Sequence, residues 1–430
     1  MIKPSKTEIP DVVVIGGGPA GLMAAGTAGK FGAKVSLFEK NEIMGKKLLI
    51  SGGGRCNMTN GEPDERVLIS KYGKKGNFLF TPFSMFGNDD AVRFFEGLGV
   101  KTKVENNFRV FPVSDKSADV LEALVKTATD NKVEFKIGSG VSEIKKAKNK
   151  IVSVILENGE EIKAKSFVLA TGGKSHPETG STGDGFKWLK MLGHKVVEAN
   201  PSLVPIKTKE KWVNELSGIT LSDVGVSLWK DGKKIINKKG RVLFTHDGLS
   251  GPTIINMSKM IADLLEGTDY EGSKEVKVAI DFFPGVGLDV MHENIRNIFD
   301  QNPRKKIKNL IFKEVPEKVY LKILSLMGMD GEWFANEVRR PERFMIVEKF
   351  KKFEFTVDRL LGYDKAIISS GGVDLTEVDF KEMRSKLFDN LFLVGDILDF
   401  DRPSGGYSLQ LCWTTGYVAG KSAAKNSEKK

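Results

Sequence analysis

The first forty residues alternate apolar segments with a glycine-rich break. Residues 12–15 form an apolar, β-branched run, residues 16–18 are all glycine, residues 20–31 are rich in alanine, and residues 35–38 are apolar again. This order predicts a strand, a tight turn, a helix and a second strand. Residues 41–90 are rich in glycine and show no sustained period, so we expect loops there.

Regular elements follow these expected loops. Residues 118–129 have the apolar spacing of a helix. Residues 151–156 and 162–164 are apolar runs on either side of an Asn-Gly pair, which is typical of a tight β-turn. They predict a hairpin that leads into a further strand at residues 167–170.

The character of the chain changes in its middle part. Residues 224–245 predict three short strands, with turns at Asp231-Gly232 and at Gly240. Residues 276–280 predict another strand, so this part is typical of antiparallel β-structure. Residues 288–350 have helical spacing with many Lys and Arg, which predicts a small helical insert.

Length and composition limit the class of protein. The 430 residues are 40% hydrophobic and 28% charged, which is typical of a folded globular protein with a large core. Cys56 and Cys412 are far apart, so the sequence encodes neither a thiolate zinc site nor a disulfide framework, and we expect a cytoplasmic location. The longest uncharged stretch, residues 12–29, is crowded with glycine, so we expect no membrane segment.

The charge of the chain permits several partners. The formal net charge is +10, from 66 basic and 56 acidic residues. This balance is compatible with nucleic acid, anionic lipid or an acidic ligand, and also with a lysine-rich solvated surface. The basic residues are dispersed as pairs and triplets and accompany no nucleic-acid-binding motif. We therefore favour the solvated surface and a small-molecule substrate, and the sequence leaves the oligomeric state open.

The glycine-rich break has the spacing of a nucleotide-binding turn. Gly16, Gly18 and Gly21 follow the G-x-G-x-x-G pattern where the first strand meets the helix. Backbone N–H groups and the positive end of the helix can receive a pyrophosphate there. Glu39 ends the second strand 18 residues beyond Gly21, where a carboxylate can accept both hydroxyls of an adenosine ribose. Because such a carboxylate disfavours a 2′-phosphate, the nucleotide is FAD or NAD, not NADP.

Four further segments decide between these two nucleotides. Residues 45–60 combine bare glycine backbone with lysines and an arginine, which suits close approach to phosphate and a flat ring. Residues 170–173 and 394–396 each close a strand, and residues 405–410 open a late helix. A nucleotide domain that needs both ends of the chain implies an extended ligand, which favours FAD.

With these segments the chain resembles the YhiN/BaiN family of aminoacetone-oxidase-like flavoproteins, in the glutathione-reductase superfamily. The resemblance covers nearly the full length, and its most specific strings lie at residues 51–57 (Ser-Gly-Gly-Gly-Arg-Cys-Asn) and 245–252 (Thr-His-x-Gly-Leu-Ser-Gly-Pro). It implies an α/β fold: a Rossmann-like FAD-binding domain built from two chain segments, with an inserted antiparallel β-barrel-like domain and a small helical subdomain. Together with the composition shifts it predicts these boundaries: 1–192 and 366–430 for the FAD-binding domain, 193–287 and 345–365 for the β domain, and 288–344 for the helical insert.

The resemblance also extends the set of expected ligand-binding residues. The residues expected to bind non-covalent FAD are Gly16, Gly18, Pro19, Ala20, Gly21, Glu39, Lys40, Lys47, Gly54, Arg55, Cys56, Asn57, Val141, Ala170, Thr171, Gly172, Gly395, Asp396, Gly405, Gly406, Tyr407 and Ser408. The sequence contains no second unit of strand, G-x-G-x-x-G, helix and acidic ribose reader, so we expect NAD(P)H to act as a transient electron donor.

Three departures from the commoner family pattern lie near the C-terminus. Asp396 stands where glutamate is frequent, residues 401–403 (Asp-Arg-Pro) replace an Asp-Gly turn, and Ser408 replaces an asparagine. We expect FAD binding to survive these changes, whereas a role tied to that asparagine does not transfer.

His246 is the candidate catalytic residue. It lies between Thr245 and Asp247, in what the pattern predicts as a strand-to-helix turn, and could relay protons at the flavin edge. The alternative is a histidine that only stabilises the turn. Cys56 beside Arg55 is a candidate low-pKa thiol, but we favour structural packing because no partner cysteine is near in sequence.

Two functions remain open at this point. The favoured one is an FAD-dependent oxidoreductase that passes a hydride between NAD(P)H, the flavin and a small acceptor of conjugated enone or imine or amine type. The alternative is an FAD-containing RNA-binding or tRNA-modifying protein. The resemblance implies diverse activities, including aminoacetone oxidation and reduction of conjugated double bonds in oxo-bile acids, so the substrate itself does not transfer.

Overall fold

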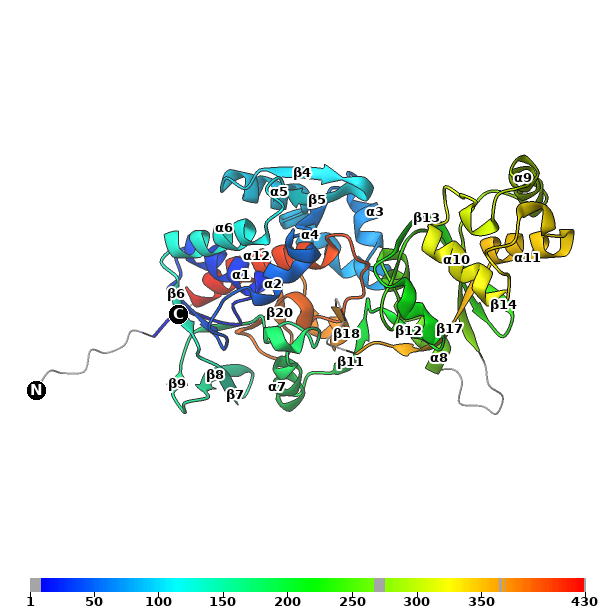
Figure 1. Ribbon diagram of the computed structural model, residues 1–430. Coiled ribbons are helices and arrows are strands. Elements are labelled where there is room, and N and C mark those ends of the chain that lie inside the picture. Colours follow the sequence, from blue (N-terminus) through cyan, green and yellow to red (C-terminus); the bar gives the residue numbers. More distant parts are fainter. Residues whose placement is uncertain (1–8, 267–274, 363–365, 367, 429–430) are drawn as a thin grey trace, which may run out of the picture. The chain divides into compact units, whose positions relative to one another are not determined.

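The computed structural model describes residues 9–266, 275–362, 366 and 368–428, which belong to two compact units (Figure 1). Unit 1 is Met1–Pro201 with Ala366–Lys430, and unit 2 is Ser202–Lys365. The predicted boundaries at residues 192, 287 and 344 remain predictions.

Unit 1 is built on a seven-stranded sheet in the order β19-β20-β21-β10-β1-β2-β6. The strands are β1 (Val12–Ile15), β2 (Val35–Glu39), β6 (Glu134–Ile137), β10 (Ser166–Leu169), β19 (Val378–Asp379), β20 (Arg384–Ser385) and β21 (Leu391–Leu393). The strands from β21 to β6 are parallel, and β20 and β19 continue the sheet in antiparallel pairing. β1 and β10 are fully buried, as expected for parallel strands covered on both faces.

Two helices from opposite ends of the chain pack side by side in unit 1. These are α1 (Pro19–Lys30) and α12 (Tyr407–Ser427), drawn in blue and red in Figure 1. A Cβ atom at Gly416 would lie 2.6 Å from the carbonyl oxygen of Ala20, and one at Gly420 would lie 2.3 Å from that of Ala24. Glycine at these two positions therefore lets the helix backbones touch.

Unit 1 also contains further helices and smaller sheets. The helices are α2 (Lys46–Ile50), α3 (Glu65–Ser70), α4 (Phe80–Met85), α5 (Asn88–Gly97), α6 (Ser117–Asp130) and α7 (Asp184–Leu192). The smaller sheets are β3-β5-β4 (Thr59–Asn60, Arg109–Pro112, Thr102–Glu105), β7-β8-β9 (Val141–Ala147, Lys150–Leu156, Glu161–Ile162) and β11-β18 (Val196–Ser202, Ile368–Val373). The prediction of loops at residues 41–90 was wrong, because helices of five or six residues are too short to produce a visible period.

Unit 2 contains a closed antiparallel barrel in the order β12-β15-β14-β13-β16-β17. Its strands are β12 (Ile206–Thr208), β13 (Thr220–Lys230), β14 (Lys233–Phe244), β15 (Gly248–Ser250), β16 (Val276–Asp281) and β17 (Phe353–Leu360). The helices of this unit are α8 (Pro252–Glu266), α9 (Leu288–Gln301), α10 (Glu317–Leu326) and α11 (Arg340–Lys351). The predicted α/β fold with an inserted β-barrel and a helical part is thus confirmed.

One predicted turn in the barrel was wrong. Residues 224–245 form two long strands joined at Asp231-Gly232, and Gly240 lies inside β14. A Cβ atom at Gly240 would lie 2.3 Å from Oγ1 of Thr253 in α8. This glycine therefore admits a helix against the strand instead of turning the chain.

A buried histidine links the segments around β11 and β20. The His194 side chain is fully buried, with Nδ1 2.7 Å from Oε2 of Glu377 and Nε2 2.9 Å from Oγ of Ser385. Desolvation lowers the pKa of His194 below its ordinary value of 6.5, although Glu377 opposes this shift. The folded protein therefore favours the neutral ring.

This histidine predicts a pH dependence of stability. Just below pH 6.5 the unfolded chain binds more protons than the folded chain, so the free energy of unfolding falls as the pH falls through this range. We expect the melting temperature to drop more between pH 7.5 and pH 5.5 in the wild type than in His194→Gln. Equal drops in the two proteins would contradict this assignment.

Candidate functional site

A cavity lies at the carboxyl ends of three central strands of unit 1. Ile15 ends β1 and Gly16 follows it, Glu39 ends β2, and Ala170 follows β10. β1 has β2 on one side and β10 on the other, so the cavity occupies the point where the strand order reverses, which is the usual ligand position in open α/β sheets. The predicted residues that line it are Gly16, Gly18, Pro19, Ala20, Glu39, Lys40, Lys47, Val141, Ala170, Thr171, Gly172 and Asp396.

Glycine is needed for a different reason at each position of the first turn. Gly16 has φ +105°, and a Cβ atom there would lie 2.6 Å from the carbonyl oxygen of Ala170. A Cβ atom at Gly21 would lie 1.9 Å from the carbonyl oxygen of Gly16, so this glycine is required for the packing of α1 on the turn. Gly18 is different, because a Cβ atom there would meet no atom within 4 Å. No side chain caps the start of α1, which leaves its first N–H groups for a ligand.

The Glu39 carboxylate is fixed at the cavity wall. The residue is 7% exposed, and Oε2 accepts a hydrogen bond from the Gly17 N–H at 2.7 Å. Oε1 accepts from the backbone N–H and the side-chain Nδ2 of Asn41, both at 2.8 Å. A carboxylate has about four acceptor positions, so this arrangement leaves one for a ribose hydroxyl. Accepting both hydroxyls, as the sequence suggested, requires Asn41 to release one of its bonds.

The cavity also contains polar groups with capacity for a ligand. The Lys47 ammonium donates to Oγ of Ser175 at 3.0 Å, and desolvation lowers the pKa of Lys47 while Asp396 opposes the shift. Oγ1 of Thr171 is buried and has no hydrogen-bond partner among the described residues. A buried hydroxyl without a partner is costly, so a polar ligand at this place would stabilise it.

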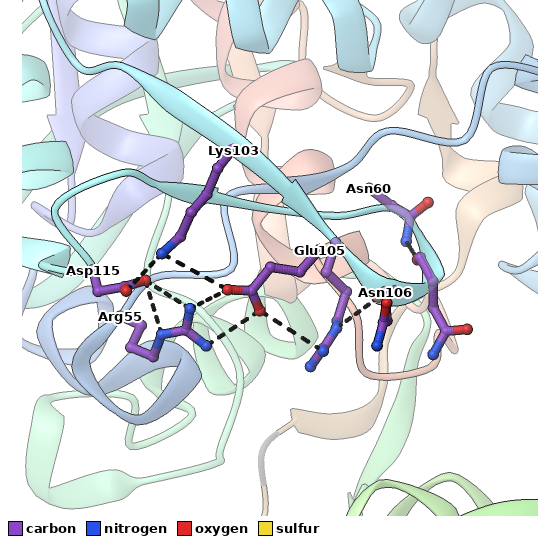
Figure 2. A network of polar contacts seen from close by, with 8 residues as sticks. Arg55, Asn60, Lys103, Glu105, Asn106 and Asp115 are labelled. Carbon is purple, nitrogen blue, oxygen red and sulfur yellow. Dashed lines mark hydrogen bonds and ion pairs between the residues drawn. The ribbon is translucent and has the colours of Figure 1, made fainter.

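The predicted residues at 54–57 do not line this cavity. Figure 2 shows Arg55 directed at Glu105 and Asp115. The Arg55 Nε atom lies 2.9 Å from Oδ1 of Asp115. The other carboxylate oxygen of Asp115, Oδ2, accepts a hydrogen bond from Nζ of Lys103 at 2.6 Å. The guanidinium lies 4.2 Å from the centre of the Phe111 ring. Arg55 is therefore paired with carboxylates from the β4 and β5 region, and a direct role with FAD remains a prediction.

Two neighbours of Arg55 in the sequence are also fixed by burial or by hydrogen bonds. Cys56 is fully buried, and desolvation raises the pKa of its thiol to about 12, which agrees with structural packing and not with a reactive thiolate. The Asn57 amide, in the orientation that satisfies its neighbours, accepts a hydrogen bond from the Gly406 N–H at 3.0 Å. Gly54 has φ +86° and lies in the same loop.

The turn before α12 packs against β3 of unit 1. Gly406 has φ +99°, and a Cβ atom there would lie 2.3 Å from the carbonyl carbon and oxygen of Thr59. Gly405 has φ +127°. The carbonyl oxygen of Tyr407 accepts from the buried Tyr72 hydroxyl at 2.8 Å. Gly21, Gly395, Gly405, Gly406, Tyr407 and Ser408 do not line the cavity, so their roles with FAD remain predictions.

Sequence reasoning missed several residues at the cavity. Asn41 orients Glu39, and the cavity wall also includes residues 179–182, Asp184 and Cys412. Arg402 was noted only as part of a departure from the family pattern, yet its side chain is 1% exposed and is paired with Asp396. A charged residue between Asp and Pro in an apolar C-terminal segment was the available signal for a buried ion pair.

His246 lies in unit 2, in the turn between β14 and β15. The predicted strand-to-helix turn was wrong, because Gly248–Ser250 form a strand before α8 begins at Pro252. The N–H of Gly248 donates to Oγ1 of Thr245 at 3.2 Å, which closes the turn. The His246 side chain is exposed, and its catalytic role remains a prediction.

The described residues offer neither a metal site nor a membrane-spanning helix. In residues 9–266, 275–362 and 368–428, no three His, Cys, Asp or Glu side chains are grouped so that they could hold a metal ion. Within the same ranges no helix has the length and apolar character needed to cross a bilayer.

The parallel sheet, the glycine turn and the cavity at the strand reversal define a Rossmann-type nucleotide-binding protein of the FAD-binding fold. The chain belongs to the HI0933-like protein Rossmann domain family, which matches residues 10–422, and this confirms the resemblance seen in the sequence.

The chain is similar over nearly its whole length to two kinds of characterised relative. It is 31% identical to the 3-dehydro-bile acid delta(4,6)-reductase of Clostridium scindens over 96% of this chain and 98% of the relative. It is 28% identical to the ribosomal RNA dihydrouridine synthase of Haemophilus influenzae over 96% and 98%.

Solved structures support the fold. A 3-ketosteroid-delta4-(5alpha)-dehydrogenase from Rhodococcus jostii matches with a TM-score of 0.53 at 16% identity, covering 98% of both chains. A flavocytochrome c3 fumarate reductase matches with a TM-score of 0.55 at 19% identity, covering 98% of this chain and 79% of the other.

Proposed function

We propose that the protein is an FAD-dependent oxidoreductase that reduces a carbon–carbon double bond conjugated to a carbonyl group. The observation that carries this proposal is the cavity at the strand reversal, with the uncapped start of α1 on one side and the buried Glu39 carboxylate on the other. A pyrophosphate and an adenosine ribose are the groups that such a pair recognises.

The residues at the cavity fit FAD. Gly18 leaves open space where the turn faces the cavity, and Thr171 offers a buried hydroxyl that has no partner in the described structure. Glu39 would bind the adenosine ribose, the N–H groups of Gly18 and Ala20 the pyrophosphate, and Asp396 a hydroxyl of the ribityl chain. FAD, when bound, would supply the hydride chemistry that amino-acid side chains lack.

The names of the relatives support a common reaction type. A delta(4,6)-reductase of a 3-dehydro steroid acid saturates double bonds conjugated to a ketone. A dihydrouridine synthase saturates the ring double bond of uridine, which is conjugated to a carbonyl group. Both reactions add a hydride and a proton across a polarised double bond. We therefore favour a conjugated carbonyl compound over an imine or amine, with NAD(P)H as the transient donor.

Anaerobic reduction tests this function directly. The purified protein should carry a chromophore that acid precipitation releases as FAD, and NADH or NADPH should bleach it. Reoxidation is then followed with a conjugated enone, its saturated analogue and an imine as acceptors. Reoxidation by the enone alone supports the proposal. A protein that binds no FAD, or whose reduced form is reoxidised by none of these acceptors, would overturn it.

A second candidate function is the reduction of uridine in RNA. The observation that favours it is the hairpin of β13 and β14, which exposes Lys233, Lys234, Lys238, Lys239 and Arg241. None of these five side chains forms an ion pair within the part of the chain that the structure describes. An exposed row of unpaired cations suits a phosphate backbone.

Charge neutralisation distinguishes the two candidates. We expect the quadruple replacement of Lys233, Lys234, Lys238 and Lys239 by Gln to weaken salt-dependent RNA binding if RNA is the substrate, because each lost phosphate contact lowers the slope of affinity against salt by about one. The matched control replaces four lysines of unit 1 by Gln. These are Lys145, Lys148, Lys150 and Lys163. Equal RNA binding by wild type and both variants would exclude this hairpin as an RNA-binding surface.

A further inference from the structure

Arg402 connects three parts of the C-terminal segment of unit 1. Its side chain is 1% exposed and pairs with Oδ1 of Asp396 through one terminal nitrogen. The other terminal nitrogen donates to the carbonyl oxygen of Phe400 at 2.7 Å. Nε donates to Oγ of Ser408 at 2.9 Å, and Ser408 is the second residue of α12.

A buried guanidinium is stable only when its donors are bound, because removal of a charge from water is costly. Arg402 meets this condition by binding in three directions at once, and its rigid planar fork fixes the three partners relative to one another. A lysine carries the same charge but lacks this geometry. The three contacts therefore require arginine at this position, and a lysine could not make all of them.

The contacts of Arg402 also join the three departures from the family pattern. Asp396, the Asp-Arg-Pro segment at 401–403 and Ser408 are apart in sequence but form one hydrogen-bonded cluster. The shorter aspartate and the serine hydroxyl are the two side-chain partners of the guanidinium. Residues at these three positions therefore depend on one another for their hydrogen bonds.

The cluster reaches the cavity through Asp396, which lines the cavity together with Lys47 and Cys412. Arg402 does not line the cavity itself, but its ion pair with Asp396 places the guanidinium directly behind the cavity wall. The guanidinium of Arg402 is thus a fixed positive charge beside a site proposed for an anionic ligand. A fixed positive charge stabilises the more negative, reduced form of a flavin more than its oxidised form.

We propose that Arg402 is a positioning residue: it holds the Asp396 carboxylate and the first turn of α12 in one arrangement at the cavity, and thereby sets both the affinity for FAD and the reduction potential of the bound flavin. This inference rests on the proposed function. The inference goes beyond the proposed function because it assigns separate roles to the geometry and to the charge of the Arg402 side chain.

Three variants separate these roles. Arg402→Met removes charge and hydrogen bonds, Arg402→Lys keeps the charge, and Lys75→Met is the matched control. Lys75 pairs at 2.5 Å with Asp399, a buried residue of the same C-terminal segment as Arg402. Neither Lys75 nor Asp399 lines the cavity. The measurements are the thermal stability of the FAD-free protein, the Kd for FAD by fluorescence quenching, and the midpoint potential of the bound flavin.

We expect Arg402→Met to raise the Kd at least about tenfold and to make the midpoint potential more negative. Arg402→Lys should raise the Kd but keep the potential near that of the wild type, and Lys75→Met should change neither. If Arg402→Met lowers only the melting temperature, with Kd and potential unchanged, the residue is structural and the inference fails while the proposed function stands. If the wild type itself binds no FAD, both fail.

Discussion

Replacement of Gly406 by valine should cost the protein both stability and FAD. Gly406 has φ +99°, and a Cβ atom there would lie 2.3 Å from the backbone carbonyl of Thr59. Backbone atoms cannot move aside as a flexible side chain can, so the start of α12 must shift. We expect a loss on the order of 3 kcal/mol in the free energy of unfolding, measured by urea denaturation, together with loss of bound FAD.

Gly97→Val is the matched control for this change. Gly97 is exposed at the end of α5, and a Cβ atom there would meet no atom within 4 Å. Valine has a somewhat higher helix propensity than glycine, so we expect Gly97→Val to change the free energy of unfolding by only about a few tenths of a kcal/mol. A Gly406→Val protein with wild-type stability and full FAD occupancy would show that the turn tolerates a side chain and does not fix the helix start.

Replacement of Gly18 by valine should remove FAD binding without harm to the fold. Gly18 has φ −78°, which any residue adopts, and the space beside it belongs to the cavity. A valine side chain would occupy the place proposed for the pyrophosphate. We expect the melting temperature of the FAD-free protein to change by less than about 2 °C, and the Kd for FAD to rise at least about a hundredfold.

Gly21→Ala provides the contrast within the same motif. Its Cβ atom would lie 1.9 Å from the carbonyl oxygen of Gly16, so we expect it to unfold the turn before any ligand is added. Normal FAD binding by Gly18→Val would place the pyrophosphate elsewhere and contradict the proposed binding mode.

The sequence predicted strands β1, β2 and β10 at the centre of the sheet, because the signals for these strands are local. The apolar run of β1, the glycine turn and the start of α1 follow each other within twenty residues, and each carries its own pattern. The cavity residues Gly16, Gly18, Pro19 and Ala20, and those at 39 and 170–172, could be found because they lie at or directly after the ends of predicted strands. A residue that follows the carboxyl end of a strand in a parallel sheet lies at the same edge of the sheet as the residues that follow the neighbouring strands.

Contacts between distant segments were not predictable in this way. The pairing of Arg55 with Glu105 and Asp115 joins positions 50 and 60 residues apart, and no periodicity links them. Gly240 appeared to be a turn because the helix that packs on it follows later in the chain.

The assembly of the central sheet from two chain segments has a consequence during synthesis. β21 pairs with β10, and α12 packs on α1, across more than 160 intervening residues of unit 2. A ribosome-bound chain that ends before residue 391 lacks one strand beside β10, the Asp396 carboxylate and all of α12. Contacts of such long sequence separation form slowly. If FAD binds at the proposed site, we therefore expect flavin uptake to follow translation of the C-terminal segment, and a nascent chain arrested in unit 2 to remain colourless.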